Sequence, residues 1–125
     1  MNISQQLERL SLLEPQLYQP EDKSRYVLPW GNPRRTVSAI NADDEDLMHL
    51  INCLKLGAIA RNWTYECAYT RVDGQLQHEV LIWISSAFTL HFPAGRGWNQ
   101  YEAIAWLNAY FEADEVAKAL ATEVA

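Results

Sequence analysis

Two strand-like segments joined by a tight turn constrain this chain more than any other feature. Asp73-Gly74 lies between segments whose residues alternate in polarity, and an Asp-Gly pair suits a type I′ turn because glycine adopts positive φ at little cost. A two-residue loop places Val72 opposite Gln75 and so fixes the register of the hairpin. We therefore expect antiparallel pairing that extends outward to Tyr65 opposite Ile82.

This register divides the hairpin side chains between two faces, because side chains alternate along a strand. One face is mostly apolar and is expected to pack on the core: Tyr65, Cys67, Tyr69, Leu76, Val80, Ile82 and Ile84. The other is mostly polar but includes two large apolar residues: Thr64, Glu66, Ala68, Thr70, Gln75, Gln77, Glu79, Leu81 and Trp83. Leu81 and Trp83 need a cover, either from the chain's own N-terminal arm or from a partner.

A third antiparallel strand is expected over residues 87–92, where apolar and polar residues alternate again. The connection through Ser85-Ser86 must then hold an odd number of residues, or contain a bulge, to keep the apolar residues on the core face. A single long strand, bent at the two serines, is the alternative. In both cases His91 joins Leu81 and Trp83 on the outer face.

Three helices are predicted from apolar spacing at about 3.6 residues. The first covers residues 4–13 and the second covers residues 41–62. The third follows Gly95-Arg96-Gly97, with Asn99 as its cap, and a kink or a separate last helix is expected near Asp114. A lone Gly-x-Gly is a weak phosphate-binding signal, so we interpret these glycines as a strand-to-helix turn.

The predicted fold class is α+β, with a three-stranded antiparallel sheet and helices packed on one of its faces. The order is helix, strand, strand, strand, helix, preceded by the short N-terminal helix and an irregular arm over residues 18–40 that is rich in proline. We expect residues 1–40 to form the N-terminal helix and arm, and residues 41–125 to form the α+β domain.

The order of elements from residue 43 to residue 111 is similar in topology to that of double-stranded-RNA-binding domains. Those domains place a lysine cluster at the start of the last helix, where it contacts phosphates. The corresponding Asn99-Gln100-Tyr101-Glu102 carries no positive charge. The resemblance therefore implies a shared architecture, with both helices on one sheet face, and we do not assign the chain to that family.

Composition limits the classes of partner. The chain of 125 residues has 16 acidic and 10 basic residues and a formal net charge of -6, which argues against nucleic acid or an anionic membrane and favours a basic protein surface. No signal peptide or membrane span is apparent, and two cysteines are too few for a disulfide framework, so we expect a cytoplasmic protein with reduced thiols.

Glu66, Glu79 and His91 are the candidate catalytic residues, because two carboxylates and an imidazole on one sheet face could perform acid–base chemistry. No nucleophile or oxyanion loop accompanies them in the sequence. We therefore interpret them as residues of a solvated face, and we expect a protein that is not an enzyme and needs no cofactor.

His49 and Cys53 are four residues apart on a predicted helix, which is a metal-ligand spacing. Helical geometry places both away from the apolar stripe of that helix, whereas Cys67 and His78 lie on the core face of the hairpin. The four residues diverge, so no metal site is expected.

The arm is locally basic and could contact nucleic acid through Lys23, Arg25, Arg34 and Arg35. The same chain carries an acidic cluster over residues 43–46, at the predicted start of the second helix. We therefore favour docking of the arm on the chain's own acidic cluster.

These observations favour a small acidic interaction protein that inhibits or regulates a basic partner protein. The expected partner-binding residues are Leu81, Trp83, Glu66, Glu79 and His91, and a homodimer through the same face or the edge of the third strand is also open. The alternatives are a nucleic-acid-associated domain that uses the arm, and an enzyme or small-ligand protein with its site on the outer sheet face.

Overall fold

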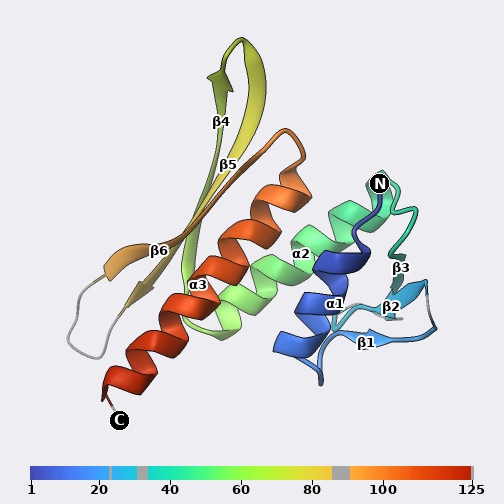
Figure 1. Cartoon of the computed structure of the whole chain (residues 1–125), viewed down its shortest axis with the longest axis horizontal. Helices are drawn as coiled ribbons and strands as arrows, with labels where there is room; N and C mark the ends of the chain where they lie inside the picture. The colour runs from blue at the N-terminus through green and yellow to red at the C-terminus, as the bar shows by residue number, and fades with distance from the viewer. Residues whose placement is uncertain (23, 31–33, 86–90, 125) are drawn as a thin grey trace. The chain divides into compact units, whose positions relative to one another are not determined.

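The computed structural model describes residues 1–22, 24–30, 34–85 and 91–124, with side chains described over these ranges except at 85, 91, 92 and 122–124. Within these ranges the chain forms three helices and two three-stranded antiparallel sheets, as Figure 1 shows. The predicted α+β class is therefore confirmed.

The chain divides into two compact units, Met1–Cys53 and Leu54–Ala125, which we call the N-terminal and C-terminal units. The units are defined by packing and not by independent folding. The domain boundary expected after residue 40 therefore stays a prediction.

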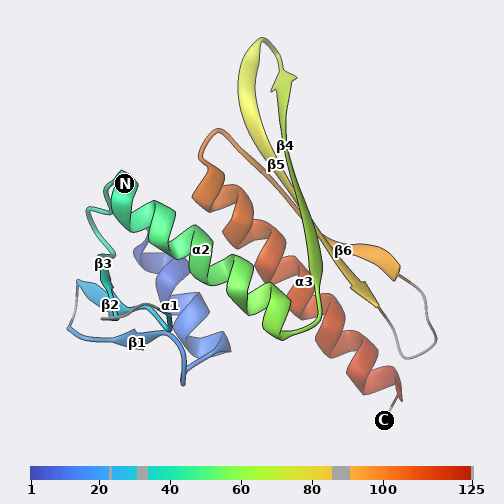
Figure 2. The same cartoon turned by 180° about the vertical axis from the view of Figure 1, so that it is seen from behind.

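The N-terminal unit contains α1 (Ser4–Leu13), whose bounds match the predicted helix, and a small sheet in the order β1-β2-β3. The strands are β1 (Gln19–Pro20), β2 (Arg25–Val27) and β3 (Thr36–Ser38), which Figure 2 shows from behind. The expectation of an irregular arm was wrong for these segments. Strands of two or three residues are too short to show an alternating pattern, so no periodic signal marks them.

Helix α2 (Asp44–Ala60) begins where two aspartates exchange hydrogen bonds. The backbone N–H of Asp46 donates to Oδ1 of Asp43 at 2.8 Å, and the N–H of Asp43 donates to Oδ2 of Asp46 at 3.2 Å. This is the reciprocal pattern of a capping box, built here from two aspartates. It explains why the helix starts after residue 43 rather than at residue 41.

The C-terminal unit contains the predicted hairpin. Strands β4 (Thr64–Val72) and β5 (Gln75–Ser85) pair antiparallel, with Val72 opposite Gln75. The turn residues Asp73 and Gly74 have φ values of 51° and 79°, as a type I′ turn requires. The register deduced from the turn is thus confirmed along the whole of β4.

The third strand, β6 (His91–Asn99), lies further along the chain than expected and completes the sheet in the order β4-β5-β6. It contains Gly95-Arg96-Gly97, so the expectation of a strand-to-helix turn there was wrong. A Cβ at Gly97 would lie 1.8 Å from the carbonyl oxygen of Ala105, and one at Gly95 would lie 2.0 Å from that of Ala109. These glycines let a helix backbone approach the strand, a known role of glycine within strands. Of the strand expected over 87–92, residues 87–90 lie outside the described residues.

A β-bulge interrupts the pairing of β5 with β6. Ile82 pairs with Gly95 but the next residue, Trp83, pairs with Pro93, so Ala94 is the extra residue. The bulge anticipated before the third strand lies within it instead. It places Pro93 rather than Ala94 opposite Trp83, and it accommodates a proline, which lacks the N–H that a regular ladder needs.

Helix α3 (Glu102–Val124) packs on one face of this sheet, most closely on β6. Its fully buried residues include Trp106, Leu107 and Tyr110, and the sheet contributes the buried residues Val80, Ile82 and Ile84. In α2, Gly57 lies so close to α3 that an added Cβ would be 2.6 Å from the Tyr110 hydroxyl. The end of α2 therefore packs on α3.

Helix α3 is continuous through Asp114, where we expected a kink or a break. The Asp114 carboxylate is buried and lies 2.8 Å from Nη1 of Arg61 and 2.9 Å from Nζ of Lys118. These two cations allow a charged residue to occupy a buried helical position. The predicted cap also differs, because Asn99 is the last residue of β6 and accepts a hydrogen bond from the N–H of Tyr101.

Candidate functional site

The candidate site is the face of the β4–β6 sheet that points away from α3, which we call the open face. The register gives three rows across the strands, and each row contributes one residue from each strand. The rows are Thr64, Trp83 and Pro93; Glu66, Leu81 and Arg96; and Ala68, Glu79 and Trp98. The structure thus brings together the sequence-predicted residues Glu66, Glu79, Leu81 and Trp83. His91 pairs with Ser85 through its backbone, and its side chain lies outside the described ones.

Pro93, Arg96 and Trp98 are site residues that the sequence reasoning missed, because residues 95–97 were interpreted as a turn. The alternation that would have revealed them is present: Arg96 and Trp98 are exposed, and Gly95 and Gly97, which alternate with them, face α3. Glycines at the inward positions of this part of the strand give no apolar pattern, so its outward residues are hard to recognise.

The Trp98 ring is fixed by two neighbours although 45% of the residue is exposed. Its indole Nε1–H donates to the carboxylate of Glu79, and the Arg96 guanidinium carbon lies 5.3 Å from the ring centroid. Arg96 also lies 3.9 Å from the Glu79 carboxylate. Glu79, Arg96 and Trp98 therefore hold one another in place on the surface, and the indole is ordered before any partner arrives.

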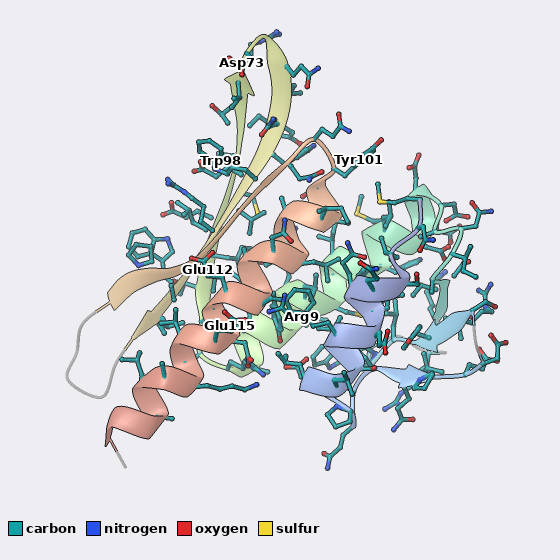
Figure 3. The ribbon with its side chains drawn as sticks, viewed as in Figure 1. Arg9, Asp73, Trp98, Tyr101, Glu112 and Glu115 are labelled. Atoms are coloured by element: carbon teal, nitrogen blue, oxygen red, sulfur yellow. The ribbon has the colours of Figure 1, made fainter. Side chains whose placement is uncertain are left out.

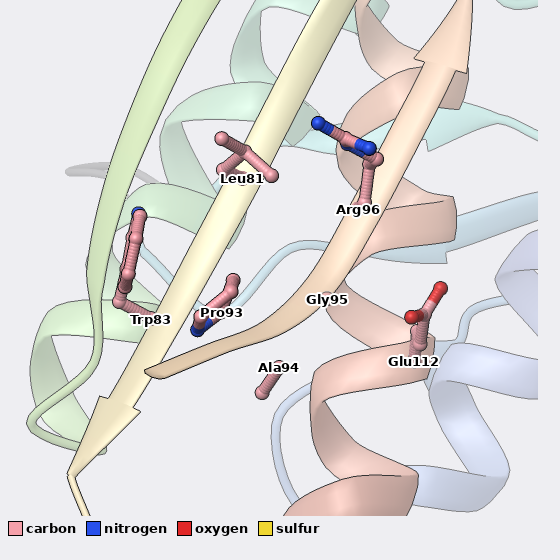
Figure 4. A pocket seen from close by; sticks show the side chains of 7 residues that line it. All are labelled: Leu81, Trp83, Pro93, Ala94, Gly95, Arg96 and Glu112. Atoms are coloured by element: carbon pink, nitrogen blue, oxygen red, sulfur yellow. The ribbon is translucent and has the colours of Figure 1, made fainter. Parts of the chain in front are cut away.

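A hollow of about 420 Å³ opens beside β6, as Figure 4 shows. It is lined by Leu81, Trp83, Pro93, Ala94, Gly95, Arg96 and Glu112. Its volume lies within the range of about 300–1,000 Å³ typical of ligand pockets. The walls are mainly apolar, whereas Arg96 and Glu112 supply one charge of each sign.

The acid–base hypothesis gains little from this geometry. Glu79 is bound by Trp98 and Arg96, so its carboxylate serves to position them. Glu66 is exposed, one strand away, in the row of Leu81. Catalysis by Glu66, Glu79 and His91 stays a prediction.

The far end of the hairpin departs from the expected core face. Tyr69 is 67% exposed, Leu76 is 52% exposed, and Cys67 is also exposed. The rings of Tyr69 and His78 contact each other, with centroids 4.6 Å apart. The reason is geometric: the hairpin extends past the start of α3 at Glu102, so the helix packs only on its other end, as Figure 3 shows.

Comparison of the chain with models of known protein families, with curated proteins and with solved structures finds no match. Within the described part of the chain, every helix is too short or too polar to cross a bilayer.

The basic arm residues lie in the N-terminal unit, apart from Lys23, which lies outside the described residues. Nε and Nη2 of Arg25 donate to Oγ1 of Thr36 at 3.2 and 3.0 Å. Nη1 of Arg35 lies 3.1 Å from Oε1 of Glu45 in the acidic cluster. Arg34 is exposed. The Arg35 contact agrees with docking of the arm on the acidic cluster, and nucleic-acid binding by the arm stays a prediction.

His49 and Cys53, two of the residues with metal-ligand spacing, have other neighbours in the structure. His49 contacts Glu45 at 3.6 Å, and the Sγ of Cys53 lies 4.0 Å from the carbonyl oxygen of Trp30. Cys53 is buried although helical geometry places it away from the apolar stripe, because the segment that contains Trp30 covers this side of α2. Among the described side chains there is no group of three or more His, Cys, Asp and Glu residues that could hold a metal ion.

Both cysteine thiols are expected to react slowly at neutral pH. Burial raises the pKa of the Cys53 thiol, and partial burial raises the pKa of Cys67 against the opposing effect of Lys55. Since the thiolate is the reactive species, both should react more slowly at neutral pH than a thiol of ordinary pKa, about 8.5.

In the folded protein, a disulfide reagent such as dithionitrobenzoate should modify the exposed Cys67 first and the buried Cys53 much later. The rate at Cys67 should continue to rise as the pH passes above about 8.5. Stopped-flow absorbance measures both phases, and the protein unfolded in guanidinium serves as the control in which the two thiols react alike. A single phase in the folded protein would contradict the difference in burial.

Proposed function

We propose that this protein acts by binding another protein through the open face, as an inhibitor or regulator of a basic partner. The observation that carries the proposal is Trp98, an indole that is 45% exposed yet fixed by Glu79 and Arg96. Tryptophan and arginine are among the residues that contribute most to binding energy at protein interfaces. An aromatic anchor that is already ordered loses little conformational entropy on binding.

Charge supports a basic partner. The chain has a net charge of -6. On the open face and in the lining of the hollow beside it, the carboxylates of Glu66, Glu79 and Glu112 outnumber the guanidinium of Arg96. Complementary charge increases association rates and disfavours partners of the same sign.

We expect Trp98→Ala combined with Leu81→Ala to reduce capture of the partner by about tenfold or more, because truncation of an aromatic anchor commonly has this effect. The tagged protein and the variant are incubated with lysate of the native host, and bound proteins are measured by quantitative mass spectrometry. Tyr69→Ala is the matched control, since Tyr69 is more exposed than Trp98 and lies on the other face of the same sheet. Circular dichroism checks that all variants fold.

Equal capture by the open-face variant and by Tyr69→Ala would remove the open face from the interface. Sedimentation of the purified protein tests the homodimer. If self-association is present and is lost with the open-face variant, the occupant is a second copy, and the heterologous partner is excluded.

A further inference from the structure

We infer that the open face binds a proline-rich, arginine-bearing segment in the polyproline II conformation. This inference rests on the proposed function and specifies its partner. The observations that carry it are the spacing of two tryptophans, the type of surface that they occupy, and the excess of carboxylates around them.

The spacing of Trp83 and Trp98 matches a short extended segment. Trp98 lies opposite Glu79 on the neighbouring strand, and Trp83 is four residues further along β5. At about 3.3 Å per residue the two indoles are offset by about 13 Å along the strands. A polyproline II helix rises about 3.1 Å per residue, so four to five of its residues bridge the two indoles.

A sheet face also limits the conformation of its occupant. The backbone groups of β5, the central strand, pair with β4 and β6. A ligand on this face therefore contacts side chains and finds no unpaired backbone N–H or C=O groups of β5 to bind. The occupant must therefore leave its own backbone solvated or internally bonded. Polyproline II meets this requirement because prolines have no N–H and the helix needs no internal hydrogen bonds.

The surface chemistry resembles that of known polyproline II binding grooves, which are lined by aromatic side chains. Trp83, Pro93 and Leu81 line the apolar part of the hollow of about 420 Å³, which can accept proline rings. Trp98 forms a fixed platform beyond it, held by Glu79. A rigid ligand on a rigid surface loses little conformational entropy.

Charge selects a basic version of such a segment. Glu112, which α3 contributes to the lining of the hollow, is exposed, and Glu66 is exposed in the row of Leu81. An arginine at either end of the segment can form a two-pronged hydrogen bond with one of these carboxylates. Arg96 already pairs with Glu79 and stacks on Trp98, so it leaves the other carboxylates to the ligand.

The test is isothermal titration of the full chain with the synthetic peptide Arg-Pro-Leu-Pro-Pro-Leu-Pro-Pro-Leu-Arg. We expect saturable binding that Trp98→Ala weakens by about tenfold or more and that Glu112→Gln weakens by a smaller factor that disappears at high salt. Tyr69→Ala is the matched control and should leave the affinity within about twofold, as expected for a residue outside the interface. A peptide with both arginines replaced by glutamate should not bind.

A second control peptide has every proline replaced by alanine, which favours an α-helix. Equal binding of this peptide would assign the face to helical ligands and overturn the inference. If the proline peptide does not bind while a host protein is still captured in a Trp98-dependent way, the inference fails and the protein-binding function stands. If neither the peptide nor a host protein depends on Trp98, both proposals fail.

Discussion

Gly97→Ala is expected to lower the free energy of unfolding by about 3 kcal/mol or more, at the upper end of the range for overpacking. The added Cβ would lie 1.8 Å from the carbonyl oxygen of Ala105 and 2.7 Å from its carbonyl carbon. Both atoms belong to the backbone of α3, so no side-chain rotation relieves the clash. Either β6 or the helix must move, and the buried contacts between them are lost. Chemical denaturation followed by circular dichroism measures the loss.

Gly74→Ala provides the matched control for this substitution. Gly74 lies in the hairpin turn at a φ of 79°, and no atom lies within 4 Å of an added Cβ. Gly74→Ala should therefore lower the free energy of unfolding only through left-handed backbone strain, by about 1–2 kcal/mol. Gly95→Ala should resemble Gly97→Ala, because its Cβ would lie 2.0 Å from the carbonyl oxygen of Ala109. A loss at Gly97 no greater than at Gly74 would refute the close packing of β6 on α3.

Asp114→Ala is the second substitution with a large expected effect, a loss of about 3 kcal/mol. The Asp114 side chain is only 4% exposed, and Nη1 of Arg61 lies 2.8 Å from its Oδ1. The Arg61 guanidinium lies within 4.6 Å of the Trp63 ring centroid and 5.5 Å of that of Tyr110. Removing the carboxylate leaves this guanidinium among aromatic rings without the anion that offsets its desolvation. Thermal and chemical unfolding of the variant measure the loss.

Lys118→Ala measures the contribution of the exposed Asp114–Lys118 ion pair separately from that of the buried Asp114–Arg61 pair. Lys118 is 67% exposed, so its contribution should be below about 1 kcal/mol, as for other exposed ion pairs. A double-mutant cycle with Arg61→Ala and Asp114→Ala then isolates the coupling between the two residues. If Asp114→Ala costs no more than Lys118→Ala, the carboxylate does not stabilise the fold in the way its burial indicates.

The sequence predicted the hairpin and its register because both depend on local information. An Asp-Gly turn of two residues leaves one pairing that places Val72 opposite Gln75, and every later pair follows from it. The prediction that Leu81, Trp83, Glu66 and Glu79 share a face followed in the same way. The bounds of α1 were also predictable, since its apolar stripe and the proline that follows it are local signals.

The other features of the fold and of the open face depend on tertiary contacts, which a sequence pattern cannot show. Gly95 and Gly97 resemble a turn until α3 is seen to lie against them, and only then are Arg96 and Trp98 recognisable as open-face residues. Alternation indicated that Tyr69 and Leu76 share a face with Val80, which is correct. It could not indicate where along the hairpin α3 begins, so it could not distinguish the buried half of that face from the exposed half.

The position of the hairpin turn also has a practical consequence. Asp73 and Gly74 lie beyond the start of α3, and the structure shows the turn at the end of the C-terminal sheet (Figure 1). Gln75, which follows the turn, is four residues from Glu79, the partner of Trp98, a separation of about 13 Å along the strand. The Asp73 side chain is exposed, so an affinity tag attached there leaves the two-residue turn intact. A protein immobilised through this tag would keep Trp98 accessible to ligand.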